Sequence, residues 1–145
     1  MEFKLVIEGT LPSLNEYIDA ERSQRHAAAR MKREAQELVC WYIRAQLGSQ
    51  AASKPVRMHY LWVVPSRRKD RDNVAFARKF IQDALVQMGF LKNDGWQHIL
   101  GWSDDFDVDA DRPRIEVTIT EVEEDEHGET DSKPRRYVRR KDQGA

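Results

Sequence analysis

The sequence contains a single cysteine, Cys40, and no long run of apolar residues. One cysteine cannot form an intramolecular disulfide, and without further paired ligands it argues against a structural zinc site. No stretch is long or apolar enough to span a membrane, and residues 1–9 (MEFKLVIEG) lack the layout of a signal peptide. We therefore expect a cytoplasmic protein in which Cys40 is a buried thiol on a helix.

The chain also has almost no net charge, -1 from 24 Lys and Arg residues and 25 Asp and Glu residues. Its average charge therefore does not indicate nucleic-acid binding. The distribution is uneven, because basic residues cluster at 22–33, 67–71 and 135–141 with acidic stretches between them. Exposed charges interact over only about 10 Å at ordinary salt, so a local basic cluster is what matters for contacts with phosphate groups.

Alternation of apolar and polar residues predicts several β-strands. They cover residues 1–9, 55–65 and 114–120, with a weaker strand at 98–102. The side chains expected to face the core are those of Phe3, Leu5, Ile7, Val56, Met58, Tyr60, Trp62, Val64, Ile115, Val117 and Ile119.

Helical periodicity predicts two helices, from about Ser23 to Leu47 and from about Asn73 to Met88. A glycine follows each one and is placed to end it, and Asp72 is the expected N-cap of the second helix. The expected buried residues are Met31, Ala35, Leu38, Tyr42 and Ala45 on the first helix and Val74, Ala77, Ile81, Ala84, Leu85 and Met88 on the second.

The order of these elements is β-α-β-α-β-β, which predicts an α/β fold with a small mixed sheet packed by two helices. The polar residues 10–26, between the first strand and the first helix, are read as a loop. A length of 145 residues is most simply one domain, here residues 1–120. Residues 121–145 hold almost no apolar residues and are expected to form a charged, disordered tail.

The segment RRKDRDNVAFARKF, residues 67–80, sets Asp70 and Asp72 among basic residues directly before the second helix. In an extended segment, residues two apart point to the same side. Two carboxylates on one side can hold a hard divalent cation such as Mg²⁺. A simpler reading stays open, in which Asp72 caps the helix and Asp70 pairs with a neighbouring arginine. Asp94 can join such a site only if the loop after the helix runs back alongside it.

Several segments occur in the order that is typical of one nuclease family: LPSLNEYI, KDRDN, DAL and GFLKNDGW. In them the chain resembles the RusA family of Holliday junction endodeoxyribonucleases, over most of residues 1–120. The resemblance implies that Asp70, Asp72 and Asp94 are catalytic acids that bind a metal ion. It also implies that Lys79 is an essential catalytic lysine.

The resemblance further implies a Mg²⁺ cofactor, with Mn²⁺ as an alternative, because a bound metal activates water and neutralises charge on the phosphate. It implies a homodimer that presents two sites to a branched, four-way DNA junction. The residues expected to bind the DNA backbone are Arg67, Arg68, Lys69 and Arg71. The segment NDGWQHILGWSDDF is most similar to phage-borne members, which suggests a bacterial or phage-infected cell.

Other functions stay open. The chain is alternatively a nuclease for other branched DNA, or a DNA-binding module without catalysis. A calcium-binding domain is a weaker alternative, because Ala110 stands where a calcium loop needs glycine. The acidic residues around it, 104–111, are read instead as a solvated loop. Residues 22–33 are either a solvated basic face or a DNA contact.

Overall fold

The computed structural model describes residues 1–123. Its elements are β1 (Glu2–Glu8), α1 (Leu14–Ser23), α2 (Ala27–Leu47), β2 (Val56–Val64), α3 (Arg71–Ala75), α4 (Arg78–Gln87), β3 (Ile99–Val108) and β4 (Arg114–Glu121). The strands form one sheet in the order β1-β4-β2-β3, in which β2 and β3 are parallel and the other neighbours are antiparallel. The predicted α/β class with a mixed sheet is therefore confirmed. Residues 124–145, most of the predicted tail, lie outside the described residues.

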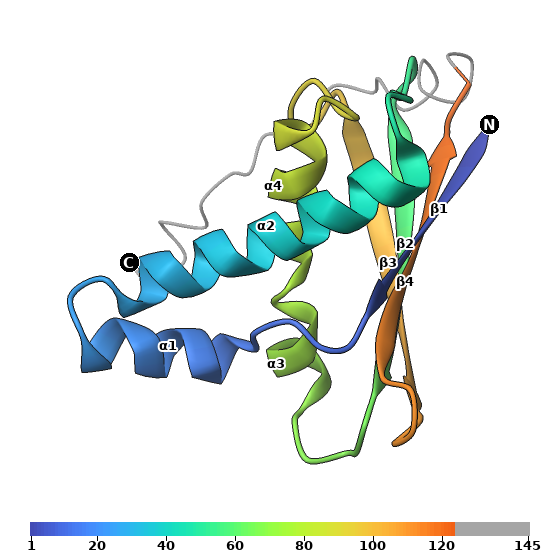
Figure 1. Cartoon of the computed structure of the whole chain (residues 1–145). Coiled ribbons are helices and arrows are strands. Elements are labelled where there is room, and N and C mark those ends of the chain that lie inside the picture. Colours follow the sequence, from blue (N-terminus) through green and yellow to red (C-terminus); the bar gives the residue numbers. More distant parts are fainter. Residues whose placement is uncertain (124–145) are drawn as a thin grey trace, which may run out of the picture.

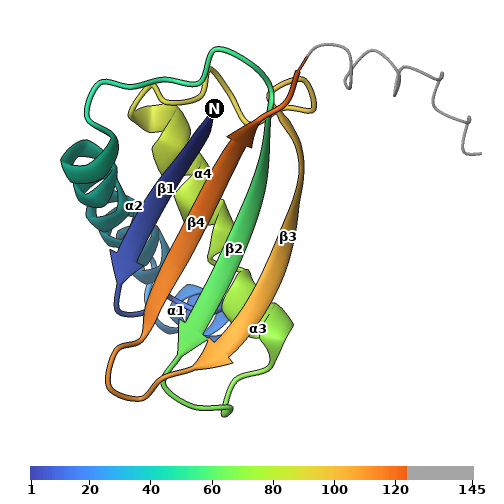
Figure 2. The same ribbon diagram turned by 90° about the vertical axis from the view of Figure 1, so that its right-hand side faces the viewer.

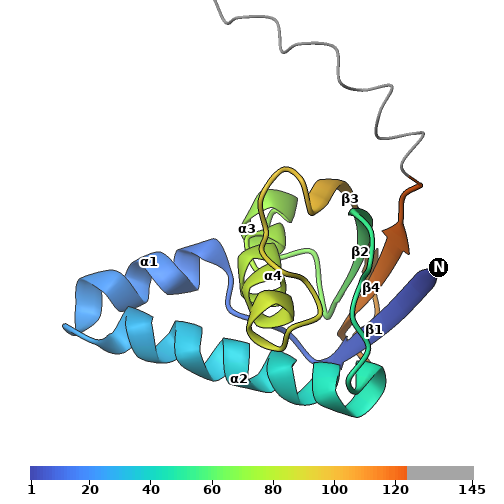
Figure 3. The ribbon, with the colours of Figure 1, turned by 90° about the horizontal axis from the view of Figure 1, so that it is seen from above.

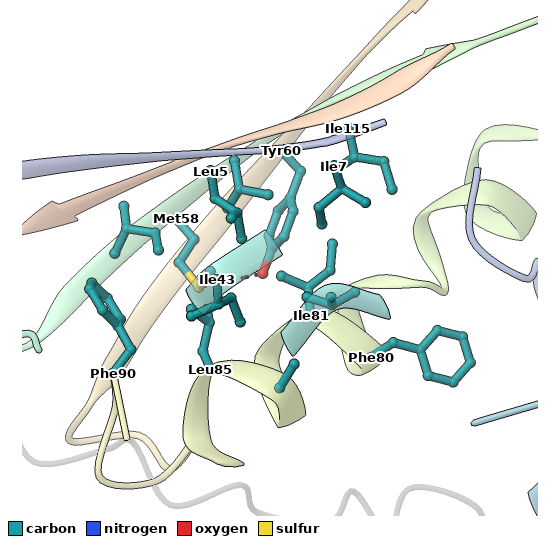
Figure 4. Close-up of a cluster of buried hydrophobic side chains, with 14 of the residues drawn as sticks. Leu5, Ile7, Ile43, Met58, Tyr60, Phe80, Ile81, Leu85, Phe90 and Ile115 are labelled. Atoms are coloured by element: carbon teal, nitrogen blue, oxygen red, sulfur yellow. Dashed lines mark hydrogen bonds between the residues drawn. The ribbon is translucent and has the colours of Figure 1, made fainter. Parts of the chain in front are cut away.

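The helices cover one face of this sheet, and the core lies between them (Figures 2 and 3). Every second side chain of β1, β2 and β4 points into this core, as the alternating pattern predicts. Of the strand residues predicted to face inward, all except Val64 are buried. Figure 4 shows the centre, where strand residues such as Leu5 and Tyr60 meet Ile43 of α2 and Ile81 and Leu85 of α4.

The prediction of a loop at residues 10–26 was wrong, because α1 occupies Leu14–Ser23. The helix begins with a capping box: the Glu16 N–H donates to Ser13 Oγ (3.4 Å), and the Glu16 carboxylate accepts the Ser13 N–H (3.4 Å). Such a box satisfies two backbone donors at once and is readable as Ser-x-x-Glu. The many charged residues in the segment concealed this signal.

The first long helix also differs from its prediction. α2 begins at Ala27 rather than near Ser23, and its buried residues are Ala35, Val39, Cys40, Ile43 and Leu47. Leu38 is 41% exposed and Ala45 is exposed, so the predicted apolar stripe was misplaced around part of the helix. Of its members, Ala35 is buried and Tyr42 is partly buried against the core. The prediction that Cys40 is buried is confirmed.

The predicted helix from Asn73 to Met88 is two helices, α3 and α4, with a break at Phe76 and Ala77. Residues two apart on a regular helix point in nearly opposite directions. Both Ala75 and Ala77 are buried here, which the break permits. Ala77, Ile81, Ala84 and Leu85 are buried as predicted, whereas Val74 and Met88 are only partly buried.

The prediction of Asp72 as N-cap was wrong. Asp70 holds the N-cap position of α3 without a side-chain cap bond, and Asp72 lies in the first turn. The third strand is also longer than the predicted 98–102, because β3 runs from Ile99 to Val108. Asp104, Asp105 and Asp107 therefore lie on a strand, and the reading of this acidic stretch as a loop was wrong for them.

Candidate active site

A surface hollow lies where β2 ends and the chain turns into α3. Figure 1 shows this turn at the end of the sheet, below α3. The residues that line the hollow are Val64, Arg67, Lys69, Asp70, Arg71, Asp72, Val74, Phe106, Asp107 and Val108. Two of the predicted acids and three of the four predicted basic residues thus share one hollow. The fourth, Arg68, lines a neighbouring, more apolar pocket between the loop after β1, the ends of β2 and β4, and α3.

The turn that carries the two aspartates is tied to the start of α1. The backbone N–H of Asn15 donates to Asn73 Oδ1 at 2.9 Å, across 58 positions of sequence. Lys69 forms an ion pair with Glu16. The hydrogen bond from Lys69 is the main reason why the pKa of Glu16 is lowered. The segments LPSLNEYI and KDRDN, which the sequence places far apart, therefore meet at the turn that carries the two aspartates.

Both aspartates of the turn are exposed. Asp72 Oδ1 accepts the N–H of Asn73 at 2.9 Å, which orients this carboxylate. The Arg71 guanidinium lies over the ring of Phe106, 5.8 Å from its centroid, and not against an aspartate. Within residues 1–123, neither Asp70 nor Asp72 forms an ion pair, so their charges are available to an external cation.

Lys79 of α4 and Asp94 of the loop after α4 form a second cluster. Lys79 Nζ lies 3.1 Å from Asp83 Oδ1 and 3.4 Å from Asp94 Oδ2. The loop after α4 therefore does run back along the helix as far as Lys79. Hydrogen bonding to Asp83, and then to Asp94, raises the pKa of Lys79. Lys32 of α2 also approaches Asp83, at 3.8 Å.

The three predicted acids are not gathered into one cluster. Among residues 1–123, no group of three or more His, Cys, Asp or Glu side chains is placed to hold a metal ion. Asp70 and Asp72 share the hollow, whereas Asp94 is paired with Lys79. Two carboxylates nevertheless suit Mg²⁺, which is often bound through one or two carboxylates, water and substrate phosphates.

The family model described as Endodeoxyribonuclease RusA matches residues 9–120, which include both the tied segments and both clusters. The chain belongs to the RusA family. Enzymes of the RusA family are endodeoxyribonucleases that cut Holliday junctions, so branched DNA is the substrate that membership implies. No curated protein matches the chain. In the described part of this RusA-family chain, no helix is long and apolar enough to cross a membrane.

One polar network of this RusA-family domain had no signal in the sequence. Asp104 on β3 accepts a hydrogen bond from Arg78 Nη1 (2.6 Å) through one oxygen and from Trp62 Nε1 (2.9 Å) through the other. The Arg78 guanidinium also lies 5.1 Å from the ring centroid of Trp102. This network joins the start of α4 to the edge strand β3. The sequence did not distinguish Asp104 from the acidic residues beside it, because the third strand was predicted to end at residue 102.

Proposed function

We propose that this RusA-family chain is a Mg²⁺-dependent endonuclease that cuts four-way DNA junctions at the hollow beside α3. The observation that carries the proposal is the hollow itself, where Asp70 and Asp72 stand without ion pairs among basic side chains. This arrangement suits a phosphodiester, because the acids attract a metal ion and the bases attract the phosphate backbone.

In this proposal Asp70 and Asp72 hold the cation, with Asp94 as a further ligand when it leaves Lys79. The bound metal supplies an activated water and neutralises charge on the phosphate, and Mn²⁺ is an alternative to Mg²⁺. An ordinary lysine is already protonated at neutral pH, and hydrogen bonding to Asp83 raises the pKa of Lys79 further. It can therefore donate a hydrogen bond to a phosphate oxygen.

Arg67, Lys69 and Arg71 line the hollow and contact the backbone on either side of the cut. Arg68 lines the neighbouring pocket and contacts the DNA further from the cut. A homodimer in a bacterial or phage-infected cell completes the proposal, because a two-fold pair of sites matches the two strands cut at a four-way junction.

The test is Asp72→Asn with a labelled four-way junction, in Mg²⁺ and in EDTA. The asparagine Oδ1 can still accept the Asn73 N–H, so the fold and junction binding should persist while cutting is lost. Asp19→Asn is the matched control, because it removes the same charge from an exposed position on α1. Mg²⁺-dependent cutting by Asp72→Asn at the normal rate would remove Asp72 from the mechanism.

Two rivals are separated by the same preparation. A nuclease for other branched DNA would cut a fork or a flap faster than the four-way junction. A DNA-binding module without catalysis would bind the junction tightly and leave it intact in both Mg²⁺ and Mn²⁺.

A further inference from the structure

Helix α1 and the first part of α2 form a hairpin that extends away from the sheet (Figures 1 and 3). We call residues 14–34 the arm and residues 22–33 its tip. The arm adds little to the core: Ala20 is the one fully buried residue of α1, and the first buried residue of α2 is Ala35. Packing in the core therefore does not determine which side chains the tip carries.

The tip is strongly positive in a chain whose net charge is -1. It contains five Lys and Arg residues and no Asp or Glu: Arg22, Arg25, Arg30, Lys32 and Arg33. The four arginines are exposed. Within the part of the chain that the structure describes, none of the four forms an ion pair or a side-chain hydrogen bond.

Local helix energetics explain these charges only in part. Arg30 and Arg33 each have a glutamate four positions on, Glu34 and Glu37, a spacing that favours opposite charges, although neither pair closes into an ion pair. Arg22 lies in the last turn of α1, where the helix dipole favours a cation. Arg30 lies in the first turn of α2, which has no acidic residue. A cation there is disfavoured by about 0.3–1 kcal/mol. Arg30 and Arg33 are also three positions apart, where like charges repel. An external anion would offset both costs.

Among residues 1–123, Lys32 is the basic residue of the tip that forms an ion pair, and it joins the arm to the cluster around Lys79. Lys32 contacts Asp83 of α4, and Asp83 also pairs with Lys79. From Lys32 back to the start of α2 at Ala27 is about 8 Å, at 1.5 Å per residue. A DNA strand carries a phosphate about every 3.4 Å along the helix axis. DNA bound beside Lys79 therefore has phosphates within reach of the tip.

We propose that the arm tip binds the phosphate backbone of one duplex arm of the DNA whose branch point occupies the hollow. The proposal rests on the proposed function for the place of the DNA. It assigns Arg25, Arg30 and Arg33 to affinity and not to cutting. Because each phosphate contact releases condensed counterions, the contribution of the tip must fall as salt rises.

The test compares two triple variants that each remove three positive charges. Arg25→Gln/Arg30→Gln/Arg33→Gln changes the tip. Lys4→Gln/Arg44→Gln/Arg57→Gln changes exposed positions on β1, the end of α2 and β2. Dissociation constants for a four-way junction are measured in EDTA, so that no cutting occurs, from about 50 to 200 mM salt. Circular dichroism and the mass in solution establish that fold and oligomeric state are unchanged.

We expect the tip variant to bind at least about tenfold more weakly at low salt, and the slope of log affinity against log salt to become shallower by about 2–3. The control variant should change both quantities much less. Equal weakening in the two variants, no weakening in either, or loss of a dimer in the tip variant would overturn the proposal. If the unmodified protein binds but never cuts, the proposed function fails while the tip result still stands.

Discussion

The hydrogen bond between Asn15 and Asn73 should matter more to cutting than to stability. Asn73→Ala removes the side-chain oxygen that accepts the Asn15 N–H at 2.9 Å. One neutral hydrogen bond contributes about 0.5–1.5 kcal/mol, so we expect the free energy of unfolding to fall by about 1 kcal/mol. The second tie, between Lys69 and Glu16, is an exposed ion pair and contributes about 0–1 kcal/mol.

The turn that carries Asp70 and Asp72 is held by few other contacts, because α3 is only 5 residues long and Ala75 is its one buried residue. Releasing the turn moves two carboxylates that must act together. A displacement of about 1 Å can reduce the rate of a reaction roughly 100-fold. We therefore expect Asn73→Ala to reduce the cutting rate at saturating junction by at least about tenfold.

The assay measures single-turnover cutting of a four-way junction, with urea unfolding of the same samples. Asn73→Asp is the matched variant, because it keeps an oxygen acceptor in the same place, and it should restore most of the rate. The reasoning is refuted if Asn73→Ala cuts at the normal rate. It is also refuted if the loss of rate is no larger than the loss of stability explains.

Two further predictions concern stability. Tyr60→Phe removes a buried hydroxyl that accepts a hydrogen bond from Gln82 Nε2 (3.1 Å), and it should lower the free energy of unfolding by about 1–3 kcal/mol, because the Gln82 amide is left unsatisfied. Urea unfolding checks it, and Tyr60→Phe with Gln82→Leu should recover part of the loss. Asp83→Asn should cost about 1 kcal/mol at pH 7, because Asp83 is only partly buried and its partner Lys79 is exposed to solvent. Because the pKa of Lys79 is raised, the stabilisation by this pair is full below the ordinary lysine pKa and is lost as pH rises through the raised value. The free energies of unfolding of the unmodified protein and of Asp83→Asn should therefore converge at high pH.

The strands were the part of the fold that the sequence predicted well, because alternation depends only on which face is buried. The core-facing residues of β1 and β4 were all correct. The helices were harder, because their ends and breaks depend on contacts made in three dimensions. At the break, the ring of Phe76 lies 5.5 Å from the ring of Tyr17 on α1, a contact between residues far apart in the sequence. No spacing within residues 73–88 indicates a partner on α1.

The candidate site shows the same limit. The sequence placed Asp70 and Asp72 on one turn, and the structure places both at one hollow. The sequence could not indicate whether the loop after α4 turns back along the helix. In the structure it does, and Asp94 reaches Lys79. The sequence also placed Asp72 and Lys79 on one continuous helix, and the break between α3 and α4 separates them.

The distribution of ion pairs separates two kinds of charge around the site. Lys69, Lys79 and Arg78 each pair with a carboxylate of the domain. The hollow keeps acidic and basic side chains that have no such partner within residues 1–123: Arg67, Asp70, Arg71 and Asp72. If these neighbouring opposite charges formed exposed ion pairs, each pair would add only about 0–1 kcal/mol to stability. Leaving them unpaired therefore costs the fold little, and it keeps two carboxylates for a cation and two guanidinium groups for phosphates. The same reasoning applies to the arm tip, where the unpaired charges are all positive and the only partner they suit is an anion.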